Sequence, residues 1–89
     1  MQTNRELAAG QIEFRNFDPR FIQITKREAY AILGFSSTTG DRQRQEDPRF
    51  PKPIHQGQSK NAPLRFVLAE VYDYSAQLIA DFREKQEVA

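Results

Sequence analysis

Residues 25–34, with the sequence TKREAYAILG, carry the local signals of one short helix. Thr25 and Glu28 form a Thr-x-x-Glu capping box, which satisfies two backbone amides at the start of a helix. Gly34 stands where a left-handed C-terminal cap is expected. We therefore predict a helix over residues 26–33. Its apolar face comprises Ala29, Ile32 and Leu33.

The segment after this helix, residues 36–49, contains no large apolar side chain. Consecutive hydroxyl residues at its start suit the N-cap of a second helix. Residues 41–46 are compatible with a helix that Asp47-Pro48 would end. Because no apolar residue anchors this segment, we expect its helix to be marginal in the free protein. The hydroxyl residues are Ser36, Ser37, Thr38 and Thr39.

Extended stretches flank the two helical segments. Asp18-Pro19 marks a turn, and residues 21–24 then indicate a short strand. Residues 50–54 are stiff and extended, because each of their prolines fixes its own φ and restricts the residue before it. A polar turn follows, after which residues 64–67 can return as the second strand of a hairpin.

Residues 68–86 form the longest predicted helix. Apolar residues recur along it with the spacing of a single buried stripe, and the opposite face is mostly acidic. We expect Tyr72 and Tyr74 to be packing residues. The predicted stripe comprises Leu68, Val71, Tyr72, Ser75, Leu78, Ile79 and Phe82.

Residues 1–19 form a mostly polar N-terminal arm, which precedes a single domain of residues 20–86 and a tail of residues 87–89. The arm holds a few large apolar side chains. They either cover the domain's own core or contact a neighbouring copy, and in the second case strand addition to an exposed sheet edge would link the copies. The apolar residues predicted for self-association are Ile12, Phe14 and Phe17.

Composition excludes several kinds of site. With 89 residues the chain makes one domain with one small core. The absence of cysteine excludes disulfides and thiolate metal sites, and a single histidine, His55, excludes a His-rich zinc site. No apolar run approaches the roughly 20 residues that span a bilayer. We expect no metal, no cofactor, no membrane contact and a cytoplasmic location.

Catalytic chemistry has little support in the sequence. Glu70 with Asp73, or Asp41 with Asp47, would be carboxylate pairs, but neither has a nearby base or metal ligand that would tune its pKa. No glycine-rich phosphate-binding loop is present. The chain is therefore not expected to be an enzyme.

Basic residues are concentrated in the middle of the chain. Residues 20–66 carry nine basic and four acidic side chains, a net charge of +5, whereas the whole chain has a net charge of only +1. Residues 67–89 carry two basic and five acidic side chains, a net charge of −3. A basic stripe in a near-neutral chain is typical of a surface that contacts a phosphate backbone, and the alternative is a solvated surface with chance clustering.

The order of these elements, together with particular residues, resembles the AlpA-type regulators and phage excisionases, a family with a MerR-like winged-helix fold. The resemblance runs from Arg20 to about Phe82, and its most specific part is residues 47–54, DPRFPKPI, which resemble the segment leading into the wing. In the family, apolar residues usually dock the second helix on the core. At those positions this chain has Gly40, Asp41 and Arg44. Weaker matches are Arg20-Phe21-Ile22, Leu33-Gly34-Phe35-Ser36, Arg65-Phe66 and Glu70-Val71.

The resemblance implies an α+β fold, a small winged helix-turn-helix with a short β-hairpin wing and a longer C-terminal helix. It also implies that the second helix enters the major groove and that the hairpin contacts the DNA backbone or minor groove. The alternative for these segments is an ordinary solvated polar loop. The DNA-contacting residues implied are Ser36, Ser37, Thr38, Thr39, Arg42, Gln43, Arg44, Lys52, His55, Lys60 and Arg65.

The family's function would make the chain an excisionase, a recombination directionality factor that bends attachment-site DNA and favours excision of a mobile element. Its partners would be double-stranded DNA, a site-specific integrase and further copies of itself along the DNA. The alternative within the family is a transcriptional regulator that acts at a promoter. A protein-interaction module that contacts no DNA is the alternative from another class.

Overall fold

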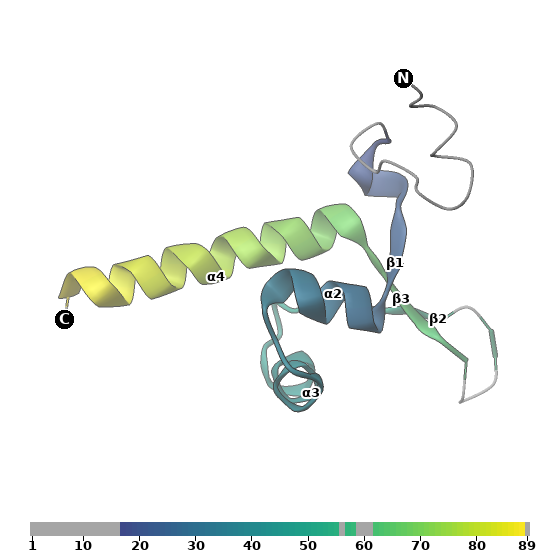
Figure 1. Cartoon of the computed structure of the whole chain (residues 1–89), viewed down its shortest axis with the longest axis horizontal. Helices are drawn as coiled ribbons and strands as arrows, with labels where there is room; N and C mark the ends of the chain where they lie inside the picture. Colours follow the sequence, from purple (N-terminus) through teal and green to yellow (C-terminus); the bar gives the residue numbers. More distant parts are fainter. Residues whose placement is uncertain (1–16, 56, 59–61, 89) are drawn as a thin grey trace, which may run out of the picture.

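The computed structural model describes residues 17–55, 57, 58 and 62–88, which form a small α+β structure (Figure 1). Within these residues, three α-helices accompany a three-stranded antiparallel sheet. The α+β class predicted from the sequence is thus confirmed. The elements are η2 (Pro19–Phe21), β1 (Gln23–Thr25), α2 (Lys26–Leu33), α3 (Ser37–Glu46), β2 (Ile54–His55), β3 (Leu64–Val67) and α4 (Leu68–Val88).

The central strand of the sheet is β3, which pairs with β1 on one side and β2 on the other. Gln23 lies opposite Val67 in the first pair, and His55 lies opposite Leu64 in the second. The predicted hairpin therefore exists, although β2 has only two residues. In Figure 1 the hairpin lies at the opposite end of the molecule from the C-terminus, and β3 leads directly into α4.

The first strand begins later than the predicted residues 21–24. A carboxylate oxygen of Asp18 accepts a hydrogen bond from the backbone amide of Arg20 at 3.0 Å and caps the 3-10 helix η2. Because this turn continues through Phe21, the strand begins only at Gln23. Phe21 is left 79% exposed on the surface.

Helix α2 has the ends that the sequence predicts. The Thr25 hydroxyl accepts a hydrogen bond from the Glu28 amide at 3.0 Å, and the Glu28 carboxylate accepts one from the Thr25 amide at 2.8 Å. Gly34 closes the helix with a φ of 76°, in the left-handed region that favours glycine. The predicted apolar face is partly wrong, since Tyr30 is buried and Ile32 is exposed. The helix contacts both α4 and α3, whereas Ile32 lies on its exposed surface.

An aromatic cluster occupies the centre of the core. Phe50, from the stiff segment between α3 and β2, lies 4.9 Å from Tyr74, 5.9 Å from Phe66 and 6.2 Å from Tyr30 between ring centroids. Such tilted and edge-on pairs are favourable beyond the area that they bury. Phe50 thus joins α2, β3 and α4 in one core. The buried apolar residues are Ile24, Ala29, Tyr30, Phe50, Phe66, Leu68, Val71, Tyr74 and Leu78.

Helix α4 buries part of the predicted stripe, namely Leu68, Val71 and Leu78. Tyr74 is buried with Leu78, whereas Tyr72, Ile79 and Phe82 are about half exposed. The buried positions 68, 71, 74 and 78 also have helical spacing, so the inward face of α4 is rotated slightly from the predicted one. The C-terminal turns of α4 extend past α2 and α3 in Figure 1. In the described part of the chain, no helix has the length and apolar character needed to cross a membrane.

Helix α3 contacts the core through a glycine. Gly40 is buried, and a Cβ atom placed on it would overlap the ring of Tyr30. The helix axis can therefore approach α2 closely although α3 contains no large apolar residue. The absence of a side chain at Gly40 is what permits this contact.

Replacing Gly40 with alanine should therefore destabilise the protein. Overpacking against Tyr30 costs about 1–3 kcal/mol, and the better helix propensity of alanine offsets up to about 1 kcal/mol of this. We expect a net loss of about 1–2 kcal/mol in the free energy of unfolding, measured by urea denaturation. Gly57→Ala is the control, because a Cβ there would meet only ordinary van der Waals contact, 3.5 Å from Ala62. Equal stability of the two variants would contradict this packing.

Candidate nucleic-acid interface

The polar segment after α2 forms a helix with defined ends. The Ser36 hydroxyl accepts a hydrogen bond from the Thr39 amide at 3.1 Å and caps α3. Asp47 ends the helix in an extended conformation, immediately before Pro48. The helix therefore begins at Ser37, earlier than the residues 41–46 that the sequence indicated.

The hydroxyl of Tyr30 makes the first polar contact between α3 and the core. It donates to the Asp41 carboxylate at 2.8 Å and accepts from Nε of Arg44 at 3.1 Å. Nζ of Lys26 lies 3.5 Å from the same carboxylate. The hydrogen bond from Tyr30 is the main reason that the pKa of Asp41 is lowered, and burial raises the pKa of Tyr30.

The hydroxyl of Tyr74 makes the second contact. It donates to the Asp47 carboxylate at 2.7 Å and accepts from Nε2 of Gln43 at 3.0 Å. Arg49 lies 3.1 Å from Asp47 and 2.9 Å from Asp81, so its guanidinium links the end of α3 to α4. Hydrogen bonds from Arg49, with a further one from Tyr74, lower the pKa of Asp47 to about 2. Burial, together with the bond to Asp47, raises the pKa of Tyr74 to about 12.

These contacts correct the expectation that nothing anchors α3. The positions where the family has apolar docking residues hold Gly40, Asp41 and Arg44, and all three contact Tyr30. Docking thus uses close backbone approach and hydrogen bonds instead of apolar side chains. Sequence periodicity of hydrophobic residues could not reveal it.

Two of the predicted DNA-contacting residues take part in this docking. Gln43 donates to the hydroxyl of Tyr74, and Arg44 donates to the hydroxyl of Tyr30. Both side chains are only partly exposed. These hydrogen bonds hold both side chains toward the tyrosines of the core.

The opposite side of α3 is open to solvent. With 3.6 residues per turn, positions 38, 42 and 45 lie opposite Gly40. The side chains there, Thr38, Arg42 and Gln45, are all exposed. Gln45 was not among the predicted site residues. The resemblance placed Gly40 at a docking position, but no apolar side chain on α3 confirmed that this side faces inward. Ser36 and Ser37 are exposed at the start of the helix, and Thr39 is half-buried.

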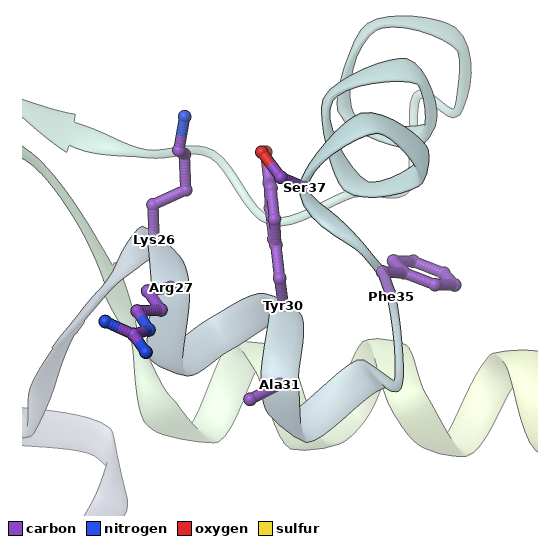
Figure 2. Close-up of a pocket in the computed structure, with 6 residues that line it drawn as sticks. All are labelled: Lys26, Arg27, Tyr30, Ala31, Phe35 and Ser37. Atoms are coloured by element: carbon purple, nitrogen blue, oxygen red, sulfur yellow. The ribbon is translucent and has the colours of Figure 1, made fainter.

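Two cations at the start of α2 lie between α3 and the hairpin. Lys26 and Arg27 line a cleft of about 440 Å³ that reaches Phe35 and Ser37 at the start of α3 (Figure 2). They also line a second cleft, of about 370 Å³, that reaches Arg65 in β3. Figure 2 shows the side chains of Lys26 and Tyr30 pointing to the same side of α2. A basic surface therefore connects α3 with the hairpin, although the sequence-based site included neither Lys26 nor Arg27.

The predicted DNA-contacting residues of the hairpin differ in exposure. Lys52 and His55 are exposed before and within β2, and Arg65 is half-buried in β3 beside Ile54 of the paired strand. Lys60 lies outside the described residues.

In the N-terminal arm, Ile12 and Phe14 also lie outside the described residues, whereas Phe17 is 51% exposed. The two alternatives for the arm therefore both remain.

Comparison with known proteins assigns no family to the chain. Neither a protein-family model, nor a curated protein, nor a solved structure matches it. Among the described residues, no group of His, Cys, Asp and Glu side chains is suited to hold a metal ion. The interface is therefore argued from the geometry of α3, α2 and the hairpin.

Removing the Tyr74 hydroxyl should weaken the docking of α3. Tyr74→Phe deletes two hydrogen bonds, one of them to a carboxylate, and we expect a loss of about 1–2 kcal/mol in the free energy of unfolding. Tyr72→Phe is the matched control, because Tyr72 lies on the same helix with half of its surface exposed. Urea denaturation of both variants is the measurement. A Tyr74→Phe variant as stable as Tyr72→Phe would show that the hydroxyl does not hold α3.

Acid should release the Asp47 contact. The folded pKa of about 2 lies below the value of about 3.9 for an unfolded aspartate. The stabilisation is therefore complete above about pH 4 and is lost as the pH falls through 2. The wild-type protein should lose more stability over this range than Asp47→Asn, measured by thermal unfolding at several pH values. Asp73→Asn, which removes an exposed carboxylate, should keep the wild-type pH dependence.

Proposed function

We propose that the chain is a sequence-specific double-stranded DNA-binding protein with a winged-helix fold. In this proposal α3 enters the major groove, and the hairpin of β2 and β3 is the wing that contacts the backbone. The order of helix, helix, hairpin and long helix supports it, as does the three-stranded sheet in which the hairpin pairs with β1.

The observation that carries the proposal is the exposed outer face of α3 beside a basic surface. Thr38, Arg42 and Gln45 present hydroxyl, guanidinium and amide groups to solvent. These groups match the donors and acceptors that base edges display in the major groove. A solvated polar loop, the alternative from the sequence, would not need the specific docking that orients this face.

The distribution of charge indicates which elements would contact the phosphate backbone. Helix α3 has two arginines and two carboxylates, so it is neutral and cannot supply the attraction to phosphate. Arg20 lies 2.6 Å from Asp18, and Arg49 is held between Asp47 and Asp81. Contacts with the phosphate backbone are therefore made by cations outside these pairs. They are Arg27, Lys52 and Arg65, together with Lys26, whose Nζ lies 3.5 Å from the Asp41 carboxylate, farther than Arg20 and Arg49 lie from their partners.

The role that we propose is that of an excisionase in the cytoplasm, without catalysis of its own. Its resemblance to the AlpA and excisionase family supports this role, and in this proposal several copies act together along the DNA. A site-specific integrase would be the partner, and the apolar residues of the arm would link the copies. Footprinting separates this role from regulation at a promoter. Repeated phased sites beside recombinase arm sites are expected for an excisionase.

DNA binding should depend on salt through these cations. If four or five phosphates are neutralised, the slope of log K against log salt should be near −4, at about −0.9 per phosphate. Arg27→Ala should make this slope about 0.9 less steep. Arg20→Ala should leave it unchanged, because Arg20 is already paired with Asp18. Fluorescence anisotropy of a labelled duplex at several salt concentrations measures the slopes.

A slope near zero for the wild-type protein would overturn the DNA-binding proposal. It would favour the protein-interaction module instead. Equal effects of Arg27→Ala and Arg20→Ala would retain DNA binding but would contradict the assigned surface.

A further inference from the structure

We infer that the outer face of α3 reads a guanine and an adenine on neighbouring base pairs, through Arg42 and Gln45 respectively. This inference rests on the proposed function and adds the bases and the residues to it. It also gives Gln43 and Arg44, the residues next to them in sequence, a different task.

The direction of each side chain on α3 follows from Gly40. Because Gly40 packs on the ring of Tyr30, it marks the side of the helix that faces the core. At about 100° per residue, Arg42 and Gln45 lie about 200° and 140° from Gly40 around the helix. Both therefore point away from the core, and both are exposed. Thr38 completes this face one turn earlier.

Gln43 and Arg44 are the alternative base-reading residues, and their hydrogen bonds to the core argue against that role. Nε2 of Gln43 donates to the hydroxyl of Tyr74 at 3.0 Å, and Nε of Arg44 donates to the hydroxyl of Tyr30 at 3.1 Å. Asp41 accepts from Tyr30 as well. These residues therefore position α3, and the polar groups left to meet a base edge are those of the outer face.

The spacing of the two outer residues suits adjacent base pairs. Three residues of helix rise about 4.5 Å, whereas successive base pairs are about 3.4 Å apart. An arginine donates to O6 and N7 of guanine, and a glutamine amide pairs with N6 and N7 of adenine. Among the described residues, Arg42 makes no ion pair that would have to break first. The two side chains are thus free to meet two purines in the major groove.

The acidic residues beside this face favour sequence-specific binding over non-specific binding to any duplex. Asp41 and Glu46 lie on the two sides of the outer face, and their carboxylates oppose close approach to phosphates. The attraction to DNA comes from Lys26, Arg27 and the hairpin. Substitutions at Gln45 should therefore change which sequence is bound more than how strongly any duplex is bound.

The test is selection of binding sites from a pool of random duplexes by the full chain. The wild-type protein and the variants Arg42→Ala, Gln45→Ala and Gln43→Ala are compared. We expect the wild-type site to contain a guanine next to an adenine. Arg42→Ala should reduce the preference for the guanine by roughly 5- to 150-fold, and Gln45→Ala should do so for the adenine. Gln43→Ala should keep both preferences and lower only the midpoint of urea unfolding.

A second variant tests whether the base selected by position 45 can be changed. Gln45→Glu replaces the amide by an acceptor, and a glutamate accepts a hydrogen bond from N4 of cytosine. The selected base at that position should change from adenine to cytosine, while the guanine is retained. Because position 45 is exposed, this variant should unfold at the wild-type urea concentration.

The outcomes separate the inference from the proposed function. Loss of base preference in Gln43→Ala, with an unchanged preference in Gln45→Ala and Gln45→Glu, would overturn the inference while DNA binding stands. Binding of all duplexes with equal affinity by the wild-type protein would also overturn it. Absence of any salt-sensitive binding to the random pool would remove the proposed function, and the inference with it.

Discussion

The contact between Gly40 and the ring of Tyr30 is the constraint on which the arrangement of α3 depends. A helix without apolar side chains cannot be held by burial of its own surface. Close approach to Tyr30 solves this, and the hydroxyls of Tyr30 and Tyr74 then satisfy polar groups along the inward side of the helix. Phe50 lies against both rings and so connects this docking to the core.

This way of docking determines what α3 can offer to a ligand. The side chains of Gln43 and Arg44 are engaged with the tyrosines, which leaves the opposite side for Thr38, Arg42 and Gln45. The helix itself is neutral, whereas Lys26 and Arg27 lie between it and the hairpin. Recognition of bases and attraction to phosphate are therefore assigned to different elements of one surface.

Much of the fold could be predicted from local signals. The capping box, the Gly34 cap and the hairpin were predicted correctly, because each depends on residues close together in sequence. The failures concern packing partners. Tyr72 and Tyr74 both fit a helical stripe that starts at Leu68, and Tyr74 is the one that packs on Phe50 and makes hydrogen bonds with Asp47 and Gln43. Gln45 was missed, and Gln43 favoured, because the inward direction of α3 depends on the distant ring of Tyr30.

If α3 presents its outer face to DNA, its inward face should stay bound to the core in the complex. An NMR titration of the isotope-labelled protein with a binding duplex tests it most directly, since the side-chain amides of Gln43 and Gln45 give separate signals. We expect the Gln45 amide signals to shift strongly, together with the backbone signals of Thr38 and Arg42, while those of Gln43 barely move. Large shifts at Gln43 with none at Gln45 would contradict it.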